Sequence, residues 1–174
     1  MILWINGAFG AGKTTIAYKL NCRLPNSFVY DPENVGSFIR NNTNGLFAKG
    51  DFQDIPLWRE MNYKTLRMIA EKYDGTIIVP MTIINPEYYS EIIERLIADG
   101  VEVRHYILYA TRKEIIRRLR KRSFLYIARN EDFALDAIDR CIYAFDNYIM
   151  DVKIFTDGMS VDSVAGKIME LLKR

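Results

Sequence analysis

Histidine and cysteine are scarce in this chain, which has one His and two Cys among its 174 residues. The lone His105 and the widely separated Cys22 and Cys141 do not offer the paired spacing of a zinc site. Two cysteines also argue against a disulfide framework, so we expect a reducing, cytoplasmic environment. The chemistry of the chain must therefore come from other residue types.

The chain also lacks a strong charge excess and any long apolar run. Its formal net charge is +2, so no overall field favours a nucleic acid or an anionic membrane as partner. No stretch approaches the roughly 18 apolar residues that span a membrane. The short apolar N-terminus has no basic segment and runs into Gly7, which predicts a strand rather than a signal peptide. We expect a single domain over residues 1–174.

Short apolar runs alternate with amphipathic segments along the chain. We predict strands at residues 2–6, 27–30, 76–80, 101–110 and 153–155. Helices are expected between them, with a break at 123–132 before a helix over 133–148. Five short strands that alternate with helices are typical of a parallel α/β sheet.

The strongest motif follows the first predicted strand. Gly7, four further residues and then Gly12-Lys13-Thr14 match the phosphate-binding loop (P-loop) pattern, in its usual strand-to-helix context. Glycines let the backbone amides turn inward around an anion, and the helix N-terminus adds a positive dipole end. We predict that ATP binds here, that Lys13 reaches its β- and γ-phosphates and that the Thr14 hydroxyl binds Mg²⁺. The predicted ATP-binding residues of this segment are Gly7, Ala8, Phe9, Gly10, Ala11, Gly12, Lys13, Thr14 and Thr15.

Two absences narrow the class of P-loop protein. The chain has no Asn-Lys-x-Asp motif for reading guanine, and the strand at 76–80 ends in Pro80-Met81-Thr82, without the acid that usually completes the Mg²⁺ site. Asp31 is the candidate replacement, because it ends the second strand at the edge where open α/β sheets bind ligands. It could take a proton from an acceptor hydroxyl or hold a metal-bound water, or it could only cap the next helix.

A basic segment precedes the predicted break. This segment is predicted to be helical, and its apolar residues mark the buried face of the helix. Arg117 and Lys121 point nearly opposite to that face, which predicts that they are solvated. Arg118 and Arg122 fall together on one flank, where they can bind phosphate. Arginine forks suit the charge of a transferring phosphoryl group, and a lid at 123–132 would exclude water from it.

These arginines resemble those of the nucleoside-monophosphate-kinase-like P-loop kinases. The family pattern is Arg-x-x-x-Arg, a lid, Arg-x-Asp-Asp and one more arginine on the next helix. Arg118 and Arg122 match the first pair, Arg129-Asn130-Glu131-Asp132 matches the second element with Glu131 in place of Asp, and Arg140 matches the last. The resemblance implies a three-layer fold with strand order 2-3-1-4-5. We therefore expect the catalytic residues to be Lys13, Asp31, Arg118, Arg122, Arg129 and Arg140. The resemblance also implies that Thr156 and Asp157 lie beside the adenine.

Several segments together resemble a narrower family, the tunicamycin-resistance ATP-binding proteins. They are MILWINGAFG (1–10), VYDPE (29–33), DFQ (51–53), PLWR (56–59), IVPMTI (78–83), PEY (86–88) and IDRC (138–141). The resemblance implies that tunicamycin, a uridine derivative with a long acyl chain, is bound or modified. It also implies membrane association through a longer C-terminal tail. This chain ends soon after its last predicted helix, so we do not expect peripheral membrane contact.

The acceptor is expected across the sheet edge from ATP, in a region around 32–73. Phe52 and Trp58 could stack on a ring or hold an acyl chain, or they could belong to the core, and Arg59 could hold an anionic or carbonyl group. The predicted acceptor-binding residues are Asp31, Phe38, Phe52, Gln53, Trp58, Arg59, Met81 and Thr82.

Two functions compete at this point. One is ATP-dependent phosphorylation of a hydroxyl on a nucleoside-type antibiotic or metabolite, with Thr14 and Asp31 as the Mg²⁺ ligands. The alternative is a non-catalytic protein that binds ATP and sequesters tunicamycin. The missing acid after the third strand favours sequestration, whereas the arginine set favours catalysis.

Overall fold

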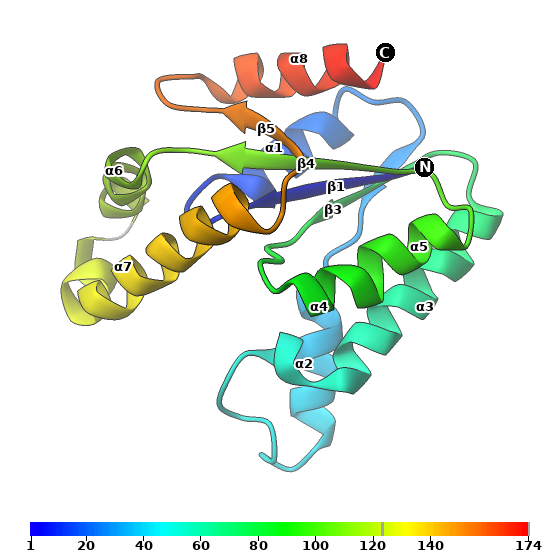
Figure 1. Cartoon of the computed structure of the whole chain (residues 1–174), viewed down its shortest axis with the longest axis horizontal. Helices are drawn as coiled ribbons and strands as arrows, with labels where there is room; N and C mark the ends of the chain where they lie inside the picture. Colours follow the sequence, from blue (N-terminus) through cyan, green and yellow to red (C-terminus); the bar gives the residue numbers. More distant parts are fainter. Residues whose placement is uncertain (123, 174) are drawn as a thin grey trace.

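Five parallel strands form one sheet in the order β2-β3-β1-β4-β5, which confirms the order implied by the kinase resemblance (Figure 1). The computed structural model describes the backbone of residues 1–122 and 124–173, and the side chains of residues 1–121 and 135–173. The strands are β1 (Ile2–Gly7), β2 (Ser27–Val29), β3 (Thr76–Pro80), β4 (Val103–Tyr109) and β5 (Val152–Phe155).

Helices cover both faces of the sheet, giving three layers. One face carries α1 (Lys13–Asn21) and α8 (Val161–Leu172). The other carries α3 (Pro56–Lys72), α4 (Pro86–Tyr89), the π-helical η2 (Ser90–Glu94) and α5 (Arg95–Ala98). The remaining elements are α2 (Glu33–Asn42) and η1 (Phe52–Asp54) after β2, and α6 (Arg112–Arg122) and α7 (Phe124–Asn147) between β4 and β5. No helix among the described residues has the length and apolarity needed to cross a membrane.

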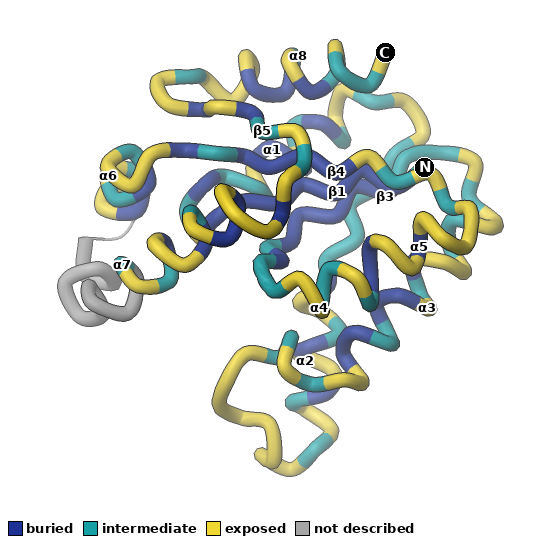
Figure 2. Tube along the Cα trace, in the orientation of Figure 1, coloured by how far each residue is buried: buried dark blue, intermediate teal, exposed yellow. Residues whose placement is uncertain are grey.

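Strand β1 is buried along its whole length, as the dark central tube of Figure 2 shows. Ile2 and Trp4 face α3 and α5, whereas Leu3 and Ile5 face α1 and α8. A parallel strand that is covered on both faces must be apolar on both, which explains why it reads as a continuous hydrophobic run. The loop that follows Gly7 is therefore attached to a strand that is buried along its whole length.

The predicted break at 123–132 is wrong as secondary structure, because α7 is helical from Phe124. Residues 124–132 contain neither glycine nor proline, so nothing in their backbone chemistry stops a helix. Ser123 and the side chains of residues 122–134 lie outside the described residues. A lid function for this segment therefore stays a prediction.

Candidate nucleotide-binding site

The loop between β1 and α1 has the backbone that its glycines permit. Gly12 immediately precedes α1 with φ +99°, in the left-handed region that favours glycine. Gly7 lies so close to β4 that a Cβ there would stand 2.8 Å from the carbonyl oxygen of Leu108. Neither position accepts a larger residue without rearrangement, so the motif's glycines are required by the local geometry.

Lys13 lies across this loop and holds it from the inside. Its Nζ donates to the carbonyl oxygens of Gly7, at 3.0 Å, and Ala8, at 3.2 Å. Burial lowers the pKa of Lys13 to about 8, and the nearby Glu33 carboxylate only partly opposes that effect. A desolvated ammonium group therefore lies within the glycine loop.

A polar pocket of about 400 Å³ opens in front of Lys13, and we call it the phosphate pocket. Its lining residues are Phe9, Gly10, Gly12, Lys13, Thr14, Thr15, Glu33, Pro80, Arg118 and Leu119. The pocket sits at the carboxyl edge of the sheet, where the P-loop, the start of α2 and the end of β3 meet. It brings together four residues that the sequence predicts to bind ATP or to be catalytic, namely Lys13, Thr14, Thr15 and Arg118.

We expect the lowered pKa of Lys13 to make nucleotide affinity pH-dependent. The protonated amine attracts phosphate, so we expect full ATP affinity below pH 8 and a fall as the pH rises through about 8, approaching tenfold per pH unit. Titration with a fluorescent ATP analogue from pH 6.5 to 9.5 would measure this. A Lys13→Arg variant should give a flat profile, because arginine stays protonated throughout. A wild-type profile as flat as that of the variant would contradict the assignment.

Two acids follow β2, and they occupy different positions. Asp31 accepts a hydrogen bond from the backbone N–H of Glu33 at 3.0 Å through Oδ1, which is the helix-capping contact considered from the sequence. Glu33, at the first position of α2, lines the phosphate pocket and acts electrostatically on Lys13. Sequence reasoning missed Glu33. The available signal was its place at a helix start on the ligand-binding edge, two residues after Asp31.

The end of β3 contributes no acid, as the sequence indicates. Pro80 lines the phosphate pocket, and the Thr82 hydroxyl donates to the carbonyl oxygen of Gly7 at 2.7 Å. Met81 is buried, and its carbonyl oxygen accepts from the indole of Trp4 at 3.0 Å. Met81 and Thr82 therefore support the P-loop from the β3 side, and their predicted contact with an acceptor stays a prediction.

Arg118 joins the phosphate pocket to a second pocket. Its guanidinium donates to the carbonyl oxygens of Ala11, at 3.1 Å, and Thr156, at 2.6 Å, and to the Thr156 hydroxyl at 3.1 Å. Glu114 accepts from Arg118 at 2.8 Å and also pairs with Arg117. The hydrogen bond from Arg117, with that from Arg118, lowers the pKa of Glu114 to about 2 although its desolvation works against this. Arg118 is thus anchored with one side toward each pocket.

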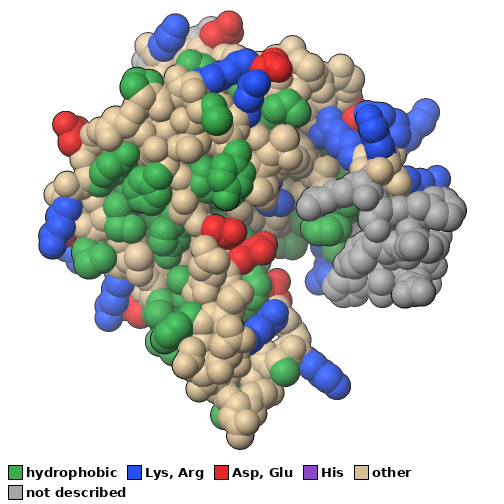
Figure 3. All heavy atoms as spheres, turned by 180° about the vertical axis from the view of Figure 1, so that it is seen from behind, with side chains coloured by type: hydrophobic (Ala, Val, Ile, Leu, Met, Phe, Trp, Pro, Cys, Tyr) green, Lys and Arg blue, Asp and Glu red, His purple; other side chains and the backbone are tan. Residues whose placement is uncertain are grey.

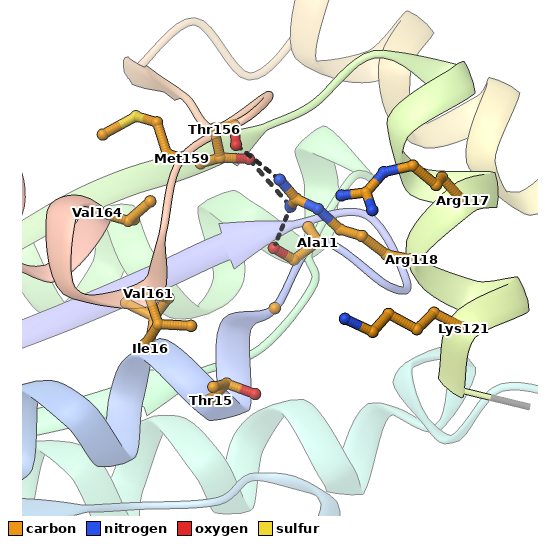
Figure 4. Close-up of a pocket in the computed structure, with 11 residues that line it drawn as sticks. Ala11, Thr15, Ile16, Arg117, Arg118, Lys121, Thr156, Met159, Val161 and Val164 are labelled. Carbon is orange, nitrogen blue, oxygen red and sulfur yellow. Dashed lines mark hydrogen bonds between the residues drawn. The ribbon is translucent and has the colours of Figure 1, made fainter.

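The second pocket, of about 330 Å³, is lined mainly by apolar groups and lies beyond Gly12 along α1; we call it the nucleoside pocket (Figure 4). Its lining residues are Ala11, Gly12, Thr15, Ile16, Arg117, Arg118, Lys121, Thr156, Met159, Val161 and Val164. Such a mixture of apolar walls and a few polar groups suits a flat heterocycle joined to a polar sugar. The predicted Thr156 lines this pocket, whereas Asp157 binds the backbone N–H and hydroxyl of Thr111, at 2.9 and 2.6 Å.

The basic helix α6 contributes more residues than the sequence indicates. Arg117 and Lys121 are exposed, in agreement with their predicted solvation, yet both also line the nucleoside pocket, and Figure 4 draws them on the same side as Arg118. Lys and Arg side chains gather at the edge of the molecule beside the undescribed residues (Figure 3). This concentration of positive charge beside the two pockets suits a polyanionic ligand.

The remaining predicted arginines are not brought to the phosphate pocket by the described contacts. The side chains of Arg122 and Arg129 lie outside the described residues, so their roles stay predictions. Arg140 pairs with Asp136 at 2.9 Å. It lines a largely apolar pocket of about 650 Å³ between the start of α4 and α7, together with Ile84, Asn85, Pro86, Asp139, Tyr143, Ala144 and Tyr148.

The predicted acceptor-side residues mostly have structural partners. Trp58 is fully enclosed, and its indole N–H donates to the carbonyl oxygen of Pro32 at 3.0 Å, while Phe52 packs against it. Arg59 pairs with Glu91 at 2.6 Å and donates to the carbonyl oxygen of Gln53, also at 2.6 Å. The exposed Phe38 lies on α2. Trp58 therefore belongs to the core, the reading left open from the sequence, and acceptor contacts by the others stay predictions.

The sheet order, the covering helices and the loop at the end of β1 are those of the P-loop nucleotide kinases. Shikimate kinase from Bacteroides thetaiotaomicron matches with a TM-score of 0.65 at 19% identity, covering 100% of this chain and 99% of that chain. A deoxyadenosine kinase from M. mycoides matches with a TM-score of 0.61 at 18% identity, covering 99% of each chain. At such low identities the likeness establishes the fold alone.

A more specific likeness is to the tunicamycin resistance protein of Deinococcus radiodurans. It matches with a TM-score of 0.80 at 27% identity, covering 99% of this chain and 95% of that chain. The resemblance inferred from the sequence segments is thereby confirmed. No protein-family model matches the chain, and comparison with curated proteins gives no match either.

Proposed function

We propose that this chain is an ATP-dependent phosphotransferase that acts on a hydroxyl group of a nucleoside-type, tunicamycin-like antibiotic or a related metabolite. The observation that carries the proposal is the convergence of Lys13, Thr14, Glu33 and Arg118 on one pocket at the carboxyl edge of the sheet. A basic clamp, a hydroxyl and an acid are the groups that phosphoryl transfer needs around the reacting phosphate. The likeness to a tunicamycin resistance protein supports the choice of acceptor.

ATP fits the two joined pockets as a substrate. The triphosphate would lie in the P-loop over residues 7–15, with its adenosine in the nucleoside pocket beside Thr156. Arg118, which borders both pockets, would bridge the two parts of the nucleotide. Mg²⁺ would be held by the Thr14 hydroxyl together with phosphate oxygens and water, and it would neutralise charge on the phosphates.

The acids after β2 would serve the acceptor. In the transfer step the acceptor oxygen forms a bond to the γ-phosphorus, the bond to the ADP oxygen breaks, and the hydroxyl proton passes to a carboxylate. Glu33 is favoured as that base because it lines the phosphate pocket. Asp31 would cap α2 and assist through its second oxygen, as a partner of the metal's water or of the acceptor. Lys13 and Arg118 would stabilise the charge on the transferring group.

Sequestration without chemistry remains the rival, because β3 ends in Pro80 rather than an acid. Mass spectrometry of tunicamycin incubated with the protein and ATP-Mg²⁺ distinguishes the two. We expect a mass gain of one phosphoryl group in the wild type and none with Lys13→Met. Tight binding of tunicamycin with unchanged mass would contradict the phosphotransferase proposal for this ligand and support the rival.

A further inference from the structure

A buried asparagine occupies the residue directly before the P-loop. Asn6 is fully enclosed and is the last residue but one of β1, on the face that carries Trp4 and His105. Its Oδ1 accepts hydrogen bonds from the backbone N–H groups of Gly7, at 2.8 Å, and Ile83, at 3.0 Å. Its Nδ2 donates to the carbonyl oxygen of Ile83 at 2.8 Å and lies 3.1 Å from Nε2 of His105. Both lone pairs and both N–H groups of this amide are therefore used.

These contacts fix the direction of a longer hydrogen-bond chain. Because Asn6 Oδ1 accepts from two backbone N–H groups, its Nδ2 must donate, and His105 Nε2 must accept. The proton of the neutral imidazole then sits on Nδ1 and is donated to Oδ2 of Asp151 at 2.6 Å. The hydroxyl of Tyr89 donates to the same oxygen, also at 2.6 Å. Although burial opposes ionisation, these two donors hold the pKa of the Asp151 carboxyl below its usual value.

The hydrogen-bond chain runs from the partly exposed Asp151 to the start of the P-loop. Asp151 precedes β5 and lines neither the phosphate pocket nor the nucleoside pocket. At the other end, Asn6 ties Gly7 to Ile83 while Lys13 and Thr82 bind the carbonyl oxygen of the same Gly7. A rotation of the Asn6 amide would break its hydrogen bonds to Gly7, Ile83 and His105 together. Low local dielectric makes such a fully satisfied network strong and its partial loss costly.

We propose that Asn6 is a positioning residue for the P-loop and that His105 and Asp151 keep its amide in the required orientation, so that Asp151 contributes to nucleotide affinity without touching the nucleotide. The inference rests on the ATP-binding part of the proposed function. It gives His105 a task that its sequence context, an alternating apolar strand, does not indicate.

The test compares two acids with similar local partners. Asp151 accepts from a tyrosine hydroxyl and from His105, and Asp146, near the end of α7, accepts from the Tyr109 hydroxyl at 3.0 Å and from Lys153 at 2.6 Å. At metal sites, removing the hydrogen-bond partner of a ligating residue typically costs about 10–100-fold in affinity or activity, and we take the lower end as the scale here. We therefore expect Asp151→Ala to weaken binding of a fluorescent ATP analogue by about tenfold and Asp146→Ala by less than about twofold.

Two further measurements separate positioning from general destabilisation. Asp151→Asn should restore most of the affinity, because its amide oxygen can still accept from His105. In an Asn6→Ala background, Asp151→Ala should have no further effect on affinity, since the hydrogen-bond chain to Gly7 is already interrupted. Equal affinity losses for Asp151→Ala and Asp146→Ala at comparable thermal stability, or additive effects with Asn6→Ala, would overturn the proposal. Wild-type protein that binds no ATP would instead contradict the proposed function, and this inference with it.

Discussion

Replacing Lys13 with methionine is expected to slow phosphoryl transfer severely and, at the same time, to stabilise the nucleotide-free protein. The rate constant should fall by about 10³-fold, the upper range for removing a group that stabilises transition-state charge. Stability should rise because the buried ammonium is costly without phosphate. The two carbonyl oxygens that it binds keep other donors, since Gly7 accepts from Thr82 and Ala8 accepts from the backbone N–H of Ala11.

The stability gain has a defined pH dependence. A lysine whose folded-state pKa is lowered to about 8 weakens the folded state wherever it is charged there, and the penalty is fully present below pH 8. The penalty is lost as the pH rises from about 8 to the ordinary value of 10.5. Thermal melts should therefore show Lys13→Met above the wild type at pH 7, by about 2–4 °C for each kcal/mol gained, and converging with it at alkaline pH.

Lys19 supplies the matched control for this prediction. It lies on the same helix but pairs with Asp162 at the surface, at 2.8 Å. Lys19→Met should leave phosphoryl transfer unchanged and should not raise the melting temperature, because surface pairs contribute little. A Lys13→Met variant that melts below the wild type at pH 7, or that retains transfer, would contradict the role given to this residue.

The Glu33→Gln variant is expected to lower the rate constant of transfer by about 10²–10³-fold, the range for loss of a general base. ATP affinity should change by less than about threefold, because amide and carboxylate have the same shape and the phosphates are held mainly by the P-loop. Steady-state kinetics with an accepted acceptor, combined with direct ATP titration, would separate the two quantities.

Comparing Asp31→Asn with Glu33→Gln shows which of the two acids acts as the base. The asparagine keeps the oxygen that caps α2, so helix geometry should be retained, and we expect the rate to fall by only about tenfold. The opposite ranking, with Asp31→Asn far more damaging than Glu33→Gln, would return the role of base to Asp31, as the sequence alone suggested. Equal and small effects would argue against a carboxylate base at this edge.

The parts of this account that the sequence could supply are those encoded by contiguous residues. The strands and the helix Val161–Leu172 follow from apolar periodicity, and the P-loop follows from one short motif. The strand order came from resemblance, because periodicity carries no information about which strands are neighbours. The break expected at 123–132 is instead helical from Phe124, and residues 124–132 contain no glycine or proline that would stop a helix.

The site was harder to predict where it depends on tertiary packing. Helical periodicity gave the exposure of Arg117 and Lys121 correctly but could not show that the loop after β5 and the start of α8 stand beside them and complete a pocket. Trp58 looked equally suited to the core and to a ligand, and only its burial decides between them. Asn6 and His105 are adjacent only because β1 and β4 pair, which no local pattern reveals.

Transfer of the γ-phosphoryl group of ATP to an acceptor hydroxyl is the central claim, and label transfer tests it most directly. ATP radiolabelled at the γ-phosphorus would be incubated with Mg²⁺, the protein and nucleoside-type acceptors, tunicamycin first, and the label followed by chromatography. The account predicts label covalently attached to an acceptor with wild-type protein and essentially none with Lys13→Met. Label that stays in ATP or appears only in free phosphate, across acceptors that demonstrably bind, would contradict it.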